Sequence, residues 1–206
     1  MEETTRHFLE QVLTPATHGP RSKIGFQVQE AGAKQSATPL PSVKMPPMVV
    51  DADGLKLLAR LPDWPARLPP MSILTPHPGE MSVLTGLSKE ELQGDRIAIA
   101  EQYAALWGHV VVLKGAFTVV ASPGGDTAVI PVATPALARA GTGDVLAGLI
   151  VGLRSQGVEA YDAALAGSWI HAQAGIYAAE DMGNTASVLA RDVLAACTPV
   201  LNGLIR

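Results

Sequence analysis

The amino-acid sequence predicts a three-layer α/β fold, in which helices cover both faces of a mostly parallel sheet. From Met48 onward, short apolar runs alternate with helical patterns, which is typical of parallel strands joined by helices. Of the 206 residues, 48% are apolar and only 4% are aromatic. The core must therefore be built mainly from Ala, Val, Leu and Ile, as expected for helices packed on a sheet.

We predict five strands, each a short apolar run bounded by turn residues or carboxylates. They span residues 48–53, 71–75, 109–114, 117–121 and 127–132. The last two flank Pro123-Gly124-Gly125-Asp126. Such a turn favours an antiparallel hairpin, which would be added to the parallel part of the sheet.

The apolar periodicity predicts helices between and after these strands. They span residues 54–61, a short segment ending near Gly86, 88–107, 141–154, 160–180 and 186–201. Ser88-Lys89-Glu90-Glu91 fits a capping box, so a helix begins there, with a break near Gly94 and an end at Gly108.

The first 47 residues differ in kind from the rest. Residues 4–13 have the pattern of a short amphipathic helix. The Pro-rich stretch 14–47 has little periodicity, and only residues 24–28 resemble a strand. We expect residues 14–47 to form a mobile loop or an insertion, because so polar a segment cannot bury enough apolar surface to offset its ordering entropy.

Charge and composition exclude several classes of partner. A net charge of −4 provides no basic patch to hold DNA or RNA by its phosphates, whereas a small nucleotide needs only local backbone donors. The single cysteine, Cys197, cannot form an intrachain disulfide. No apolar run reaches the ~18 residues of a membrane span, and the acidic N-terminus is unlike a signal peptide. We therefore expect a cytoplasmic protein with no membrane partner.

The segment Gly141-Thr142-Gly143-Asp144 carries the strongest chemical signal. Glycines let successive backbone amides point into one space, and the helix that follows adds its unpaired donors and the positive end of its dipole. The result is an anion hole suited to the terminal phosphate of a nucleotide. Asp144 at its edge could accept a proton from a substrate hydroxyl. A structural alternative stays open, because an Asp in the first turn stabilises a helix without any ligand.

Three other strand ends carry candidate residues. Thr75-Pro76-His77-Pro78-Gly79-Glu80 places His77 where open α/β sheets bind ligands. In Lys114-Gly115-Ala116-Phe117-Thr118, the lysine could reach phosphate and the glycine permits a close backbone approach. Asp51 and Asp53 could help to organise a metal. A solvated histidine, a lysine at a bulge and a helix-capping Asp53 remain alternatives. His171 lies in an Ala-rich predicted helix, and we interpret it as structural.

These segments, in this order, resemble the motifs of the ADP/ATP-dependent NAD(P)HX dehydratases. The matching segments are DADGL (51–55), ILTPHPGEMSVLTG (73–86), VVLKGAFTVVASPGG (111–125) and AGTGDVLAGLIVGL (140–153). The resemblance covers residues 48 to about 200 and implies a ribokinase-like fold. Gly-Thr-Gly-Asp recurs throughout ribokinase-like kinases, whereas Thr-Pro-His-Pro-Gly-Glu is much more specific to the dehydratases.

The resemblance also implies a reaction and a set of roles. The hydrated cofactor NADHX or NADPHX would be dehydrated to NADH or NADPH, with ADP or ATP as phosphate donor and Mg²⁺ assisting. His77 and Asp144 would contact the hydrated cofactor, with Asp144 as the base. Lys114, Gly115, Ala116, Phe117 and Thr118 would line the nucleotide site together with Gly141, Thr142 and Gly143.

The sequence departs from the family pattern in two places. The usual N-terminal glycine-rich unit is absent, and five strands are too few for the family's sheet. We therefore expect an N-terminally truncated single domain over residues 1–206, a sheet incomplete on its N-terminal side, and self-association into a homo-oligomer over the open edge. Residues 134–140 lack the usual Asn and Gly, although Arg139 could supply a charge.

Two alternative functions stay open. The same anion hole would serve a ribokinase-like kinase acting on small alcohols such as vitamin precursors. The departures from the family pattern would also fit a catalytically inactive fragment that binds nucleotide.

Overall fold

The computed structural model describes residues 4, 5, 7, 12, 13 and 45–204. Contacts divide the chain into residues 1–46 and 47–206, and the fold described below is that of the second part. In the first part, the described positions 4, 5, 7, 12 and 13 are helical, within the helix predicted over 4–13. The strand predicted over 24–28 and nearly all of the predicted loop over 14–47 lie outside the described residues.

The described strands form one five-stranded sheet in the order β1-β2-β3-β4-β5. They are β1 (Val49–Val50), β2 (Ile73–Leu74), β3 (Val110–Leu113), β4 (Val119–Ala121) and β5 (Thr127–Val129). Strands β1, β2 and β3 are parallel, and β4 and β5 add an antiparallel hairpin. All five predicted strands are present but shorter than expected, because left-handed residues such as Ala52 and Phe117 bend the chain at their ends.

Most helices begin and end close to their predicted positions. They are α2 (Asp53–Leu58), α4 (Pro78–Thr85), α5 (Lys89–Gly94), α6 (Arg96–Trp107), α7 (Thr142–Ser155), α8 (Ala160–Asp181) and α9 (Ala190–Leu204). The capping box at Ser88 is confirmed, since its hydroxyl accepts from Glu91 N at 3.2 Å. The predicted break and end are also present, at Gly94 and Gly108.

Two short elements were not predicted from the sequence. Helix α3 (Trp64–Arg67) has four residues, and the 3₁₀ turn η1 (Pro135–Leu137) has three. Neither is long enough to show a helical period in its apolar residues, so pattern analysis could not find it.

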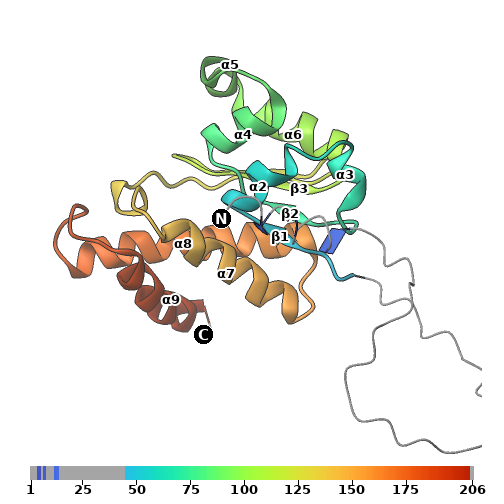
Figure 1. Ribbon diagram of the computed structural model, residues 1–206. Helices are drawn as coiled ribbons and strands as arrows, with labels where there is room; N and C mark the ends of the chain where they lie inside the picture. The colour runs from blue at the N-terminus through green and yellow to red at the C-terminus, as the bar shows by residue number, and fades with distance from the viewer. Residues whose placement is uncertain (1–3, 6, 8–11, 14–44, 205–206) are drawn as a thin grey trace, which may run out of the picture. The chain divides into compact units, whose positions relative to one another are not determined.

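The three-layer arrangement is confirmed. Helices α7 and α8 cover one face of the sheet, and α6 lies on the other face with the shorter helices α2 to α5 (Figure 1). The core between the sheet and α7 and α8 contains eight buried residues: Ile73, Val110, Val112, Val120, Leu146, Ile150, Ala160 and Ala164. Val110 and Val112 share this face because side chains alternate along a strand. No helix in the described part of the chain is both long enough and apolar enough to cross a membrane.

Helices α7 and α8 pack closely at a glycine. A Cβ built on Gly167 of α8 would lie 2.8 Å from Ile150 Cγ1 and 3.4 Å from the Ile150 backbone nitrogen. Ile150 is fully buried, so it has no free space into which to move. The glycine therefore sets the distance between the two helices.

We expect Gly167→Ala to destabilise the protein by about 1–3 kcal/mol, because overpacking outweighs the better helix propensity of alanine. Gly148→Ala is the matched control. Like Gly167, Gly148 lies inside a helix, here α7, but an added Cβ there meets nothing within 4 Å. The free energy of unfolding of that variant should rise by up to about 1 kcal/mol. Urea unfolding of both variants measures the difference, and equal shifts would contradict the packing argument.

Candidate functional site

The site forms where three parallel strands end. Asp51 follows β1, Thr75 follows β2 and Lys114 follows β3. The carboxyl ends of parallel strands meet at one edge of a sheet, which is where open α/β sheets bind ligands. The ends of β2 and β3 are joined directly, since Lys114 N donates to Pro76 O at 2.9 Å.

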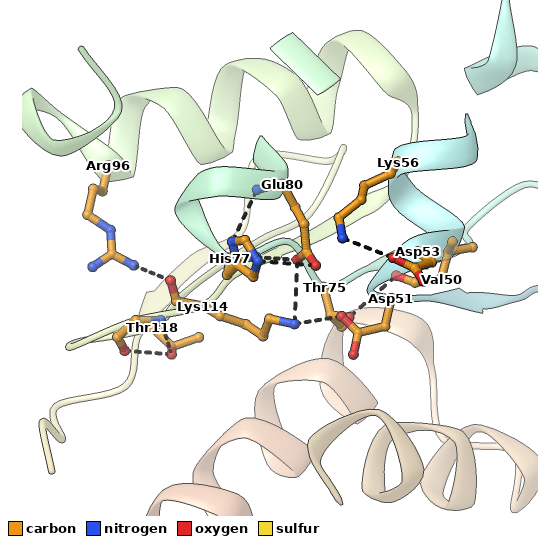
Figure 2. A network of polar contacts seen from close by, with 11 residues as sticks. Val50, Asp51, Asp53, Lys56, Thr75, His77, Glu80, Arg96, Lys114 and Thr118 are labelled. Atoms are coloured by element: carbon orange, nitrogen blue, oxygen red, sulfur yellow. Dashed lines mark hydrogen bonds and ion pairs between the residues drawn. The ribbon is translucent and has the colours of Figure 1, made fainter. Parts of the chain in front are cut away.

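Lys114 is held between two carboxylates. Its Nζ lies 2.6 Å from Asp51 Oδ1 and 3.7 Å from Glu80 Oε2. Figure 2 shows the lysine side chain extended between these two residues. Because all three side chains are largely buried, with exposed fractions of 18% for Lys114, 14% for Asp51 and 4% for Glu80, each charge needs the others. The lysine is therefore both charged and fixed in place.

The turn after β2 is built around a second capping box. His77 Nδ1 accepts from Glu80 N at 3.1 Å, and Glu80 Oε2 accepts from His77 N at 2.8 Å. Pro78 occupies the first position of α4, where its missing N–H costs nothing. A Cβ on Gly79 would lie 2.8 Å from His77 Cε1, so only glycine leaves room for the ring. Each residue of His-Pro-Gly-Glu thus has a local structural role.

The segment after β3 is clamped by Arg96. Its guanidinium donates to Ala116 O at 2.6 Å, Leu113 O at 2.9 Å and Lys114 O at 3.2 Å. Gly115 has a φ of 148°, and a Cβ there would lie 3.0 Å from the same guanidinium. Sequence analysis missed Arg96. The sequence did contain a signal. A cation in the first turn of a helix interacts unfavourably with the helix dipole, so an arginine at the start of α6 indicates another role for that residue.

The N-terminus of α7 lies beside the lysine. Gly141 has a φ of 86° and no side chain caps the helix. Thr142 N donates to Arg139 O at 3.3 Å, and the next two amides, of Gly143 and Asp144, keep free donors. The Thr142 hydroxyl lies 2.7 Å from Leu137 O and 2.8 Å from Arg139 O, which ties the preceding loop to the helix. A Cβ on Gly143 would lie 3.6 Å from Lys114 Nζ. The glycine turn at the start of α7 and the lysine therefore face one space.

That space is a cavity of about 810 Å³, within the range of small-ligand sites. The predicted residues that line it are His77, Lys114, Gly115, Ala116, Thr118, Thr142 and Gly143. Apolar residues from the loop before α7 complete the wall, namely Ile130, Val132, Pro135 and Leu137. The structure therefore brings the histidine, the lysine and the glycine turn together in one cavity.

Other predicted residues lie outside the cavity lining. Phe117 and Gly141 are not part of the wall. Asp144 is exposed in the first turn of α7, next to Gly143, and its side chain forms no hydrogen bond or ion pair with another described residue. Asp53 begins α2, where its 85% exposed side chain pairs with Lys56 at 2.9 Å.

Asp51 and Asp53 therefore contact different lysines and do not act as a pair. Within the described residues, no group of three or more His, Cys, Asp or Glu side chains is arranged to hold a metal ion.

His171 lines the cavity, although the sequence favoured a structural role. Its Nε2 and the Ser168 hydroxyl are buried without a hydrogen-bond partner among the described residues, and both residues belong to the wall. Burial lowers the pKa of His171 to about 4; nearby Lys114 also lowers it, and a backbone hydrogen bond with Thr142 opposes the shift. The sequence signal for this role was the spacing of Ser168 and His171. Two polar residues three apart on an Ala-rich helix must share one face.

Comparison with known proteins identifies relatives for this fold and site. The family model described as NAD(P)H-hydrate dehydratase matches residues 29–198. A bifunctional NAD(P)H-hydrate repair enzyme of Moorella thermoacetica is 43% identical over 165 residues, which cover 80% of this chain and 31% of the relative. The ADP-dependent (S)-NAD(P)H-hydrate dehydratase of Neisseria meningitidis is 39% identical, covering 78% of this chain and 55% of the relative. The chain thus spans from just under a third to just over half the length of these relatives.

Solved structures agree with the predicted ribokinase-like fold. The ADP/ATP-dependent NAD(P)H-hydrate dehydratase of Bacillus subtilis, co-crystallised with ATP and Mg²⁺, matches with a TM-score of 0.68 and 33% identity. The match covers 79% of this chain and 58% of that one. A ribokinase-like superfamily protein of Enterococcus faecalis, at 20% identity and a TM-score of 0.65, supports the fold alone.

The buried His171 predicts a pH dependence of stability. Its folded pKa of about 4 lies below the ordinary 6.5, so between these values the unfolded chain binds a proton that the folded chain does not. The contribution of His171 to the free energy of unfolding is fully present above pH ~6.5, and it falls by up to roughly 3 kcal/mol as the pH drops to ~4.

Chemical unfolding of wild type and His171→Asn across this range measures the effect. The variant should lose less stability on acidification. The pKa of His109 is also lowered by burial, but this residue is present in both proteins and its effect cancels in the comparison. Parallel curves would contradict the assignment.

Proposed function

The chain belongs to the NAD(P)H-hydrate dehydratase family, and we propose that it dehydrates NADHX or NADPHX to NADH or NADPH, with ADP or ATP as phosphate donor. The observation that carries this proposal is the single cavity shared by His77, Lys114 and the N-terminus of α7. A kinase of small alcohols would also use the anion hole, but His77 and its capping turn favour the dehydratase.

The phosphates of the nucleotide would bind at the end of the cavity formed by α7 and Lys114. The first amides of α7 offer donors and the positive end of a helix dipole. Lys114 adds a fixed cation, and the clamped Gly115–Thr118 segment lines the cavity beside it. These groups are placed before the ligand arrives, so they stabilise developing charge without reorganising.

The hydrated ring would lie at the exposed side of the same cavity. His77 has a side chain that is 52% exposed, and Asp144 is exposed beside Gly143. In the proposed reaction, Asp144 accepts the proton of the C6 hydroxyl while that oxygen attacks the terminal phosphorus of the nucleotide. The C6–O bond then breaks with phosphate as leaving group, and the neighbouring ring carbon loses a proton. The products are the reduced cofactor, phosphate and the shortened nucleotide.

Mg²⁺ fits the carboxylates present. In nucleotide sites this ion usually takes one or two carboxylates together with phosphate oxygens, so a cluster of three protein ligands is not needed. Asp51 Oδ2 lies 3.7 Å from the position of a Cβ on Gly143, at the start of α7. Asp51 would therefore hold the ion together with phosphate oxygens of the nucleotide. When bound, it neutralises charge on the transferring phosphoryl group.

Two further properties follow from the sequence and stay predictions. We expect a cytoplasmic protein that takes hydrated cofactor and adenine nucleotide as its ligands, with no nucleic-acid or membrane partner. We also expect a homo-oligomer, since β1 and β5 lie at the edges of the described sheet and edge strands are commonly covered. Light scattering at micromolar concentration tests the assembly, and a monomer would contradict it.

Asp144→Asn should lower kcat by about 100-fold or more, because a general base contributes that much to proton transfer. The calorimetric Kd for ADP should stay within about threefold, since a rim residue adds little to nucleotide affinity. The assay supplies NADHX, Mg²⁺ and ADP or ATP, and follows the return of reduced-nicotinamide absorbance.

Asp162→Asn is the matched control, because Asp162 also lies exposed in the first turn of a helix, α8. It should leave the rate unchanged. No absorbance recovery by wild type with either nucleotide would overturn the proposed activity, and ADP binding without turnover would identify a nucleotide-binding fragment.

A further inference from the structure

We propose that Glu80 is a positioning residue of the site, which fixes the tautomer of His77 and, together with Asp51, holds Lys114 in place. The expected effect on catalysis rests on the proposed function. The positioning itself is inferred from contacts within this chain. Glu80 is buried, with 4% of its side chain exposed, and its carboxylate faces three donors. A buried carboxylate that served only as a helix cap would need one.

The first two contacts fix the His77 ring. Its Nδ1 accepts the hydrogen bond from Glu80 N at 3.1 Å, so that nitrogen carries no proton. The proton of the neutral ring is then on Nε2, which lies 3.3 Å from Glu80 Oε1. Glu80 thus contacts both ring nitrogens, one through its backbone and one through its carboxylate. The ring is held in one tautomer and one orientation.

Histidine is an unusual choice for this capping position. Ser, Thr, Asp and Asn are the preferred N-caps, and Ser88 fills the same role at α5 eleven residues later. The ring also requires glycine at position 79, because a Cβ there would approach His77 Cε1 to 2.8 Å. A residue that needs such accommodation, where a smaller one would cap as well, points to a second use of the ring.

The third contact links His77 with Lys114, and both of these residues line the cavity. Glu80 Oε2 accepts from His77 N at 2.8 Å and lies 3.7 Å from Lys114 Nζ. The same carboxylate therefore adjoins the histidine expected to meet the hydrated ring and the lysine expected to meet phosphate. Figure 2 shows Glu80 between the two side chains. A change at Glu80 should disturb both without removing either.

Glu80→Gln makes this testable, because an amide cannot satisfy the same partners. The carboxylate accepts from His77 N on one oxygen and places the other 3.3 Å from Nε2 of the ring, whereas an amide has one acceptor and one donor group. Whichever way the amide turns, its NH₂ faces a donor. The ring can relieve this only by giving up its contact with Glu80 N or by moving its proton.

The direct measurement is the tautomer of His77 by nitrogen NMR of the ligand-free chain. The His77 signal is assigned by its absence in His77→Gln. Wild type should show the Nε2–H tautomer alone, and Glu80→Gln should show a mixture of tautomers. In turnover assays, kcat/KM for NADHX should fall by about 10-fold to 100-fold in Glu80→Gln, the range seen when the orienting partner of a metal-binding histidine is removed.

Glu91→Gln is the matched control, since Glu91 closes an exposed capping box of the same design at α5. It should show at most a small drop in melting temperature, an unchanged His77 tautomer and an unchanged kcat/KM. A single Nε2–H tautomer in Glu80→Gln, or an Nδ1–H tautomer in wild type, would overturn the inference. Because the NMR needs neither nucleotide nor hydrated cofactor, a wild type without turnover would count against the proposed function and leave this test standing.

Discussion

The ion pair between Lys114 and Asp51 is the contact on which the site depends. It joins the ends of β1 and β3 across β2, with 2.6 Å between Nζ and Oδ1, and both side chains are largely buried. Removing one member of such a pair leaves an uncompensated charge, which usually costs about 3–5 kcal/mol. The lysine side chain is therefore held in place by a contact that links two strands of the sheet. Everything that faces the cavity, from the capped histidine to the glycine turn, is arranged around that fixed cation.

Much of the fold could be predicted because its local signals agree with one another. The box at Ser88, the break at Gly94 and the left-handed Gly108 were all visible as residue types. Strand lengths were overestimated, since apolar runs continue past the points where left-handed residues such as Phe117 end the pairing. Pattern analysis has no access to backbone angles of this kind at a residue other than glycine.

The candidate site was predicted unevenly, for a physical reason. Residues that follow a strand or begin a helix, such as His77, Lys114 and Gly143, are marked by their place in the chain. Arg96 begins α6 and His171 lies inside α8, but neither segment follows a strand that ends at the site. Their roles depend on which carbonyl groups or cavity they meet, and only the packed fold decides that. Asp51 and Asp53, which are neighbours in sequence, contact different lysines, and only the packed fold shows this.

The contact between Gly167 and Ile150 has a consequence for how the site could move. With α8 resting against the backbone of α7, neither helix can slide along the other without a clash. The amide donors at the start of α7 are thus a rigid reference frame. The 130–139 loop, which lines the cavity, is tied to the start of the same helix, because the Thr142 hydroxyl lies within hydrogen-bond distance of Leu137 O and Arg139 O.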